Sequence, residues 1–236
     1  MKNNLTQLRK EILSAADPAR AKVSAWFFKT GKGQYGEGDK FLGLTMPLQR
    51  KIVSRYQNFS FADIEKLLHD KYHEMRMAGV LMLVNDFKKG DEEKKKKIFD
   101  FYLAHATQIN NWDLVDVSAE YVVGAFLENK SRKILDDLAS SKNLWERRIS
   151  IISTFYFIKK KKYQTTFTIA YKLLGDKEDL IHKATGWMLR EVGKRCGQEV
   201  EEIFLKKYAP KMPRTMLRYA IEHFSPEKKK KYLTQK

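Results

Sequence analysis

Hydrophobic residues recur at the three- and four-residue spacing of amphipathic helices along most of the chain, and no segment alternates convincingly between hydrophobic and polar residues. The best strand candidate, ISIISTFYFI at residues 149–158, follows LWERR and precedes a run of lysines, so the whole segment has the length of a helix. The SFAD sequence at 60–63 is a capping box before IEKLL, and the prolines stand at breaks between helical segments. The pattern predicts an all-α fold.

A repeat organises these helical segments. Arg76, Arg148 and Lys183 each have a second basic residue twelve positions later, and they are separated by 72 and 35 residues. A period of about 36 residues in a helical chain is typical of helix pairs stacked as an α-solenoid, as in HEAT and TPR proteins. The same step leads from Arg76 to Trp112 and from Lys183 to Arg218.

Length and composition allow one sizeable domain or two small ones. The chain has 236 residues, of which 43% are hydrophobic, enough to bury a sizeable core. We expect a single HEAT-like repeat domain over residues 1–236, with a helical N-terminal part at 1–58 and the repeats over about 59–236. Equivalent positions of stacked repeats form a continuous ridge, and we expect a curved solenoid with a basic concave face.

The chain is strongly basic. Its formal net charge of +17 and its pI near 9.7 exceed what solubility requires, and such a field attracts phosphate polyanions or anionic lipid headgroups. Nucleic acid is the first candidate. The alternative is that the lysine runs at 94–97, 159–162 and 228–231 only solvate helix ends, where cations complement the helix dipole.

The sequence features that indicate a cellular compartment favour the cytoplasm. Cys196 is the single cysteine, so no intrachain disulfide can form, and no apolar run approaches the roughly 20 residues that a membrane span needs. The N-terminal sequence MKNNLTQLRKEI lacks the apolar region and cleavage site of a secretory signal. We therefore expect a cytoplasmic protein without a membrane partner.

The repeat register gathers chemically distinctive residues. Trp112 and Asp116 lie one helical turn apart, as do Lys183 and Trp187, and Arg148 occupies the equivalent position in the repeat between them. One interpretation is structural: the tryptophans are core residues and Asp116 pairs with Arg148 across a repeat interface. The other is a cleft in which basic residues hold phosphates and indole faces pack against sugars. A lone carboxylate weakens the binding of a polyanion. Its presence therefore favours a catalytic role over a role in binding alone.

Other candidate motifs fail their structural tests. GKGQYG at 31–36 matches G-x-G-x-x-G, but it follows the helical pattern VSAWFFKT instead of a strand, so we interpret it as a loop. His69 and His73 are four residues apart and lack a third nearby ligand of zinc-site type, so we expect no metal. No serine or cysteine lies in a recognisable nucleophile motif, which leaves chemistry through Asp116 without a metal or cofactor.

The motifs NWDLVD, LWERR, KATGWMLRE and FLGLTMP together resemble those of the DNA alkylation repair family, the AlkD-type alkylpurine DNA glycosylases, over about residues 20–224. The resemblance implies HEAT-like repeats that hold duplex DNA on a concave face. It also implies hydrolysis of the N-glycosidic bond of N3- or N7-alkylated purines, such as 3-methyladenine and 7-methylguanine, by a monomer without a cofactor and without base flipping. The chain departs at two positions: Asn111 replaces a tryptophan of the WWDxVD motif, and Phe27 stands where those members have a tyrosine.

By motif, the resemblance assigns catalytic roles to Asp116, Trp112 and Trp187, and a phosphate contact to Arg148. Asp116 would stabilise the positive charge that develops on the deoxyribose. Further candidates for DNA contact are Lys183, Arg76, Arg218 and Phe27. Two alternatives remain open: a repeat module that binds distorted or branched DNA without catalysis, and a protein-interaction solenoid whose basic surface meets an acidic partner.

Overall fold

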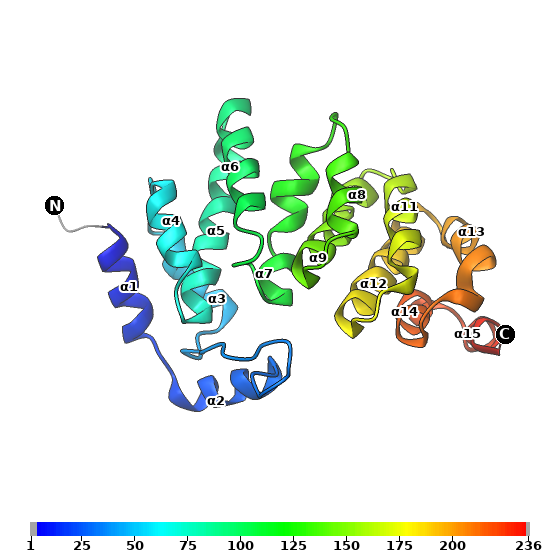
Figure 1. Cartoon of the computed structure of the whole chain (residues 1–236), viewed down its shortest axis with the longest axis horizontal. Coiled ribbons are helices and arrows are strands. Elements are labelled where there is room, and N and C mark those ends of the chain that lie inside the picture. Colours follow the sequence, from blue (N-terminus) through cyan, green and yellow to red (C-terminus); the bar gives the residue numbers. More distant parts are fainter. Residues whose placement is uncertain (1–3, 235–236) are drawn as a thin grey trace. The chain divides into compact units, whose positions relative to one another are not determined.

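The computed structural model describes residues 4–234, and the regular structure of this part of the chain is helical (Figure 1). Residues 4–234 contain no β-strand; an isolated parallel bridge joins Lys40 to Tyr72. The best strand candidate of the sequence, residues 149–158, lies in two consecutive helices. The all-α prediction is confirmed.

The chain divides into two compact units, Met1–Ser118 and Ala119–Lys236. The helices of the first unit are α1 (Asn4–Ser14), α2 (Pro18–Phe27), α3 (Met46–Val53), α4 (Phe61–Leu68), α5 (His73–Lys89), α6 (Glu92–Ala104) and α7 (Trp112–Asp116). The α-helices of the second unit are α8 (Lys133–Ala139), α9 (Leu144–Ser153), α10 (Phe155–Lys159), α11 (Gln164–Lys172), α12 (Asp179–Cys196), α13 (Gln198–Tyr208), α14 (Arg214–Ala220) and α15 (Pro226–Thr234). It also has a π-helical turn, η1 (Glu120–Gly124), and the 3₁₀ turns η2 (Leu173–Gly175), η3 (Ala209–Lys211) and η4 (Ile221–His223).

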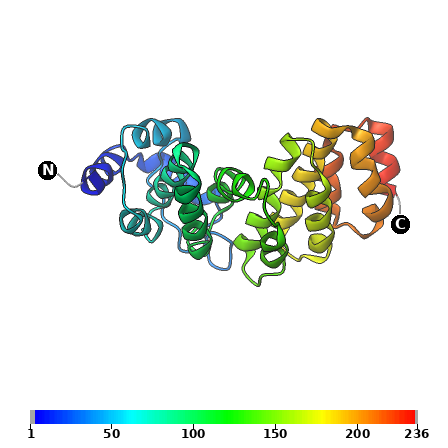
Figure 2. The ribbon, with the colours of Figure 1, turned by 90° about the horizontal axis from the view of Figure 1, so that it is seen from above.

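The period found in the sequence corresponds to helix pairs. Arg76, Trp112, Arg148, Lys183 and Arg218 lie in α5, α7, α9, α12 and α14. Because α4 packs on α5, α8 on α9 and α11 on α12, the register residue of these pairs lies on the second helix. In the second unit α12 contacts both α9 and α14, and Figure 2 shows the helices of this unit, coloured green to red, stacked side by side in sequence order. Helix-pair repeats of the α-solenoid kind are thus confirmed, while the curvature and the basic concave face stay predictions.

Helix α5 is the centre of the first unit. It packs against α3, α4 and α6, and buries Met75, Val80 and Leu83 completely. A helix that is enclosed on all sides carries apolar residues around its whole circumference. The polar residues at its first turn, His73, Glu74 and Arg76, are also buried and therefore need partners from neighbouring segments.

The FLGLTMP motif forms a tight turn between α2 and α3. Gly43 has φ +88°, and a Cβ atom there would lie 2.3 Å from the Asp17 carbonyl oxygen, so only glycine fits. The buried Glu74 carboxylate accepts backbone N–H bonds from Leu42, Gly43 and Leu44 at 2.8, 2.8 and 3.3 Å. This motif therefore positions α2 and α3 against the start of α5.

Helix α12 has the corresponding central place in the second unit. It contacts α9, α11, α13 and α14 and buries Ile181 and Met188. Gly186, the glycine of KATGWMLRE, lies against α14, where a Cβ atom would be 2.4 Å from the Met216 carbonyl oxygen. Part of this motif therefore serves helix packing, and its neighbour Trp187 is held at a fixed place on α12.

Candidate functional site

Helix α7 begins at the tryptophan of NWDLVD. Asn111 is its N-cap: the side-chain oxygen accepts the Trp112 backbone N–H at 2.8 Å, and the side-chain amide donates to Asp39 Oδ2 at 3.4 Å. Asn111 is completely buried. The residue that departs from the family pattern therefore fixes the start of α7, and the helix then carries Trp112 and Asp116 one turn apart on one face.

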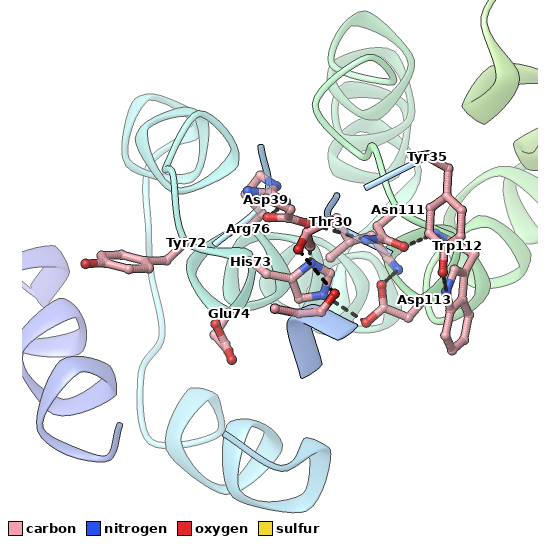
Figure 3. Close-up of polar contacts among 12 residues, drawn as sticks. Thr30, Tyr35, Asp39, Tyr72, His73, Glu74, Arg76, Asn111, Trp112 and Asp113 are labelled. Atoms are coloured by element: carbon pink, nitrogen blue, oxygen red, sulfur yellow. Dashed lines mark hydrogen bonds and ion pairs between the residues drawn. The ribbon is translucent and has the colours of Figure 1, made fainter. Parts of the chain in front are cut away.

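A buried polar network holds α7 against α5 and the end of the glycine-rich loop (Figure 3). The His73 imidazole contacts Asp39 Oδ2 through Nδ1 at 3.1 Å and Asp113 Oδ2 through Nε2 at 2.9 Å. Arg76 donates to Asp39 Oδ1 at 2.6 Å and to the Asp70 carbonyl at 3.0 Å. His73 thereby connects Asp113 in α7 to Asp39 in the loop.

The charges of this network reinforce one another. Burial opposes the charged imidazolium, but the Asp113 and Asp39 carboxylates outweigh it and raise the pKa of His73 to about 9. Burial likewise opposes ionisation of Asp39, yet its contacts with His73 and Arg76 hold the pKa of this carboxyl below its usual value. At neutral pH two carboxylates therefore bind two cations, and His73 donates a hydrogen bond from each ring nitrogen.

Stacked rings run from this network to Trp112. His73 stacks on Phe41 at 4.6 Å between ring centroids, Phe41 on Phe28 at 4.9 Å, and Phe28 on Trp112 at 5.2 Å. The interplanar angles along this series are 23°, 18° and 19°. Phe27 approaches Trp112 edge-on at 5.9 Å and is 54% exposed. One face of the indole is thus packed against Phe28, and an exposed aromatic ring lies perpendicular to the indole.

The glycine-rich loop reaches the same tryptophan. The Trp112 indole N–H donates to the Tyr35 hydroxyl at 3.3 Å, as Figure 3 shows. Gly33 and Gly38 have φ values of +74° and +81°, and at Gly36 a Cβ atom would lie 2.4 Å from the Phe28 carbonyl oxygen. The loop prediction for this segment is confirmed. Its glycines allow a tight fold that places Tyr35 against the indole.

Asp116 ends α7 and is half-buried. Burial raises the pKa of Tyr102, and the Asp116 carboxylate raises it further. The Tyr102 hydroxyl lies 2.7 Å from Ser118 Oγ, which itself donates to the Leu114 carbonyl at 2.6 Å. Tyr102 therefore donates to Ser118. The negative charge of Asp116 acts electrostatically on the buried Tyr102 hydroxyl.

In the second unit, Arg148 contacts α12, and Trp187 is a residue of α12. Arg148 is 4% exposed, and its Nη1 donates to the Leu180 carbonyl at 2.6 Å. Trp187 is half-buried and lies 5.8 Å from the Phe155 ring, measured between centroids. The Phe155 ring also lies beneath Lys159 Nζ at 4.5 Å. Trp187 therefore lies beside an aromatic ring that also contacts a cation.

Comparison with known proteins supports the family resemblance of the sequence motifs. Residues 8–224 match the family model described as DNA alkylation repair enzyme. The chain belongs to the DNA alkylation repair enzyme family. A solved structure described as "Predicted DNA alkylation repair enzyme from Enterococcus faecalis" is similar with a TM-score of 0.69, at 15% identity, over 89% of this chain and 97% of that chain. At this identity the likeness supports the fold. No curated protein matches the sequence.

Membership of the DNA alkylation repair family confirms the resemblance identified from the motifs and supports a role in DNA repair. No helix among residues 4–234 is both long and apolar enough to cross a membrane.

The structure places the basic candidates for DNA contact in different surroundings. Arg218 is exposed on α14, and Lys183 is partly exposed and pairs with Asp179 at 2.7 Å. Arg76, in contrast, is 5% exposed and engaged by Asp39 and by the Asp70 carbonyl. This structure gives Arg76 a structural role, and we do not retain it among the DNA contacts.

Sequence reasoning missed the residues that orient Trp112. Tyr35, Asp39 and His73 lie far from it in the sequence, and no local pattern joins them. Asp113 is part of the NWDLVD motif, so its position was a usable signal. The glycine-rich loop supplies two of these residues, and its G-x-G-x-x-G pattern does not indicate this role.

Proposed function

We propose that this protein is a DNA glycosylase that excises N3- and N7-alkylated purines from duplex DNA. The observation that carries the proposal is the pair Trp112 and Asp116, set one turn apart on a helix whose start is fixed by buried contacts, in a chain of the DNA alkylation repair family. The net charge of +17 supports duplex DNA as the partner.

The proposed chemistry needs one carboxylate. An N3- or N7-alkylated purine is cationic, so it is a good leaving group and requires no general acid. The bond between C1′ and the base nitrogen breaks, its electron pair moves to the purine, and the base leaves neutral. Water then adds to C1′ and loses a proton. The carboxylate of Asp116 stabilises the oxocarbenium character of the sugar as this bond lengthens and orients the attacking water.

The magnitude of this effect can be bounded. A preorganised charge that faces a developing opposite charge is worth roughly 10² to 10³ in rate, or about 3 to 4 kcal/mol. Preorganisation requires that the helix carrying Asp116 does not move, and the N-cap at Asn111 together with the Asp113–His73 contact supply that rigidity. We assign these residues a positioning role and Asp116 the catalytic role.

The aromatic and basic candidates contact DNA in this proposal. The half-buried indoles of Trp112 and Trp187 pack against the sugar–phosphate backbone and favour a cationic sugar. Phe27, exposed beside Trp112, adds apolar contact. Lys183 binds phosphate and Arg218 extends the basic surface. Arg148 is 4% exposed and donates to the Leu180 carbonyl, so we assign it to holding α9 against α12, as Arg76 holds the start of α5. Following the family resemblance, the lesion is recognised without base flipping, through backbone contacts, lesion charge and weakened stacking, by a monomer.

The test is the identification of bases released from methylated duplex DNA by chromatography. Wild-type protein should release 3-methyladenine and 7-methylguanine, and Asp116→Asn should release neither above the spontaneous level. Asp137→Asn is the matched control, because it removes the charge of an exposed aspartate on α8 and should leave release unchanged. Release that is equally fast with Asp116→Asn contradicts the catalytic assignment.

The alternative is a repeat module that binds distorted or branched DNA without catalysis. The departures at Asn111 and Phe27 favour it, because active members of the family are expected to carry tryptophan and tyrosine there. A wild-type protein that retards DNA in a gel but releases no base would support this alternative. The Asn111 N-cap argues against a collapsed site, since the asparagine holds Trp112 in place.

A further inference from the structure

A cluster of metal-ligating side chains lies away from the residues described above. Glu65 is in α4, His69 follows its last residue, and His105 follows the last residue of α6. One ligand atom from each of the three side chains lies within 4.8 Å of the other two. The spacing from Glu65 to His69 puts these two side chains on one helix face. All three belong to the first unit.

The hydrogen bonds of His105 prepare one ring nitrogen for a ligand. Its Nδ1 lies 2.8 Å from the Phe101 carbonyl oxygen and therefore carries a hydrogen. In the neutral ring Nε2 then presents its lone pair, and this atom lies 3.3 Å from Glu65 Oε1. A proton on His105 or a metal ion between these two acceptors would satisfy both of them. A backbone carbonyl that fixes the tautomer of a ligating histidine is a recurrent feature of metal sites.

His105 is held firmly, whereas its partners can adjust. Its ring stacks on Phe101 at 4.1 Å, and Phe101 stacks on Phe61 of α4 at 4.8 Å. The side chain of His105 is 15% exposed and that of Glu65 is 52% exposed. His69 is exposed as well, with its ring edge-on to His105 at 6.1 Å. One fixed ligand with two mobile ones allows the site to contract around an ion.

The backbone around the cluster also favours a cation. His69 is the C-cap of α4 and His105 is the C-cap of α6. The C-terminal end of a helix carries partial negative charge, so both helices present their negative ends to this region. The carboxylate of Glu65 adds a full negative charge.

We propose that Glu65, His69 and His105 bind a divalent transition-metal ion, with Zn²⁺ as the best match. Two imidazoles and one carboxylate suit Zn²⁺, whereas Mg²⁺ and Ca²⁺ prefer oxygen ligands alone. Bond lengths of about 2.0–2.1 Å in a tetrahedral site place ligand atoms about 3.3 Å apart, so the ligand atoms must approach by at most about 1.5 Å. Water occupies the fourth position. The ion would connect α4 to α6, both of which pack on α5.

This site would revise the expectation from the sequence. We expected no metal because His69 and His73 lack a third nearby ligand. In the structure His73 is buried with Asp39 and Asp113, and the partners of His69 are Glu65 and His105. The proposal is independent of the glycosylase assignment, because none of its residues contacts DNA in that assignment.

The test is titration of the full chain, free of any histidine tag, with Zn²⁺ by calorimetry and with Co²⁺ by visible absorption. We expect one saturable Zn²⁺ per chain below about 100 µM, and the intense visible band of four-coordinate Co²⁺. Glu65→Gln, His69→Ala and His105→Phe should each weaken binding by at least about tenfold. His105→Phe keeps an aromatic ring on Phe101, and circular dichroism confirms that the variants are folded.

The matched control is His223→Ala, which removes a histidine from the second unit and should leave Zn²⁺ affinity unchanged. Absence of saturable binding would overturn the proposal and leave a proton between His105 and Glu65. Binding that is equal in the wild type and the three variants, or that is lost in His223→Ala, would place the ion elsewhere and also overturn it.

Discussion

The protonated His73 is predicted to stabilise the first unit in a pH-dependent way. The ordinary pKa of histidine is about 6.5, and burial between Asp113 and Asp39 changes it to about 9 in the folded chain. A raised pKa stabilises the folded state fully below about pH 6.5, and this contribution is lost as the pH rises through about 9. The shift of about 2.5 units corresponds to about 3 kcal/mol, at about 1.4 kcal/mol per unit.

The perturbation that isolates this contribution is His73→Gln, which keeps an N–H donor for one carboxylate and removes the charge. The free energy of unfolding is measured with urea at pH 6.5 and at pH 9.5. At pH 6.5 the variant should be about 3 kcal/mol less stable than the wild type, and at pH 9.5 the difference should nearly vanish. Nuclear magnetic resonance of the His73 ring should give a midpoint near pH 9.

A second buried group titrates in the same direction and is controlled by the comparison. Burial raises the pKa of Glu201 to about 9, so its protonation also makes stability fall with rising pH. This contribution is common to the wild type and to His73→Gln and cancels in their difference. A difference that does not change with pH, or a His73 midpoint near 6.5, would refute the reasoning.

Three further predictions concern packing and DNA contact. Asn111→Ala removes the N-cap of α7 and a buried donor to Asp39, and should lower the free energy of urea unfolding by about 1–3 kcal/mol; an unchanged midpoint would remove its positioning role. Gly186→Ala puts a Cβ atom 2.4 Å from the Met216 carbonyl oxygen and should destabilise the folded chain by about 1–3 kcal/mol. Calorimetry should then give a melting temperature several degrees lower. Equal melting temperatures for the two proteins would mean that α14 moves without strain. Phe27→Ala should leave thermal stability nearly unchanged, because the ring is 54% exposed. It should weaken the binding of duplex DNA, measured by fluorescence anisotropy, about three- to tenfold. Unaltered affinity would exclude this ring from the DNA interface.

The helices could be predicted from the sequence because their signals are local. Ser60 caps α4 and accepts the Asp63 N–H, as the SFAD pattern predicts, and Asp17 caps α2 before Pro18. The repeat register also identified second helices of pairs, since helix-pair repeats keep equivalent positions on equivalent helices. Register, however, does not determine exposure. Arg76 occupies a register position and is buried in an ion pair.

The polar network and the proposed metal site could not be predicted because they depend on contacts between distant segments. Tyr35 reaches Trp112 across 77 residues, and His73 reaches Asp113 across 40. The pairing of Glu65 with His105 also spans 40 residues. Residue types alone suggested His69 with His73, four positions apart on the chain. The packing of α4 and α6 on α5 decides instead which histidine is near.

The most direct test of the proposed function is the single-turnover rate of excision from a duplex that contains one 7-methylguanine, measured with saturating wild-type protein and with Asp116→Asn. We predict that the rate constant of the variant falls by roughly 10² to 10³, while its affinity for the same duplex stays equal or increases, because an anion facing phosphates is removed. Equal rate constants for the two proteins would contradict the account.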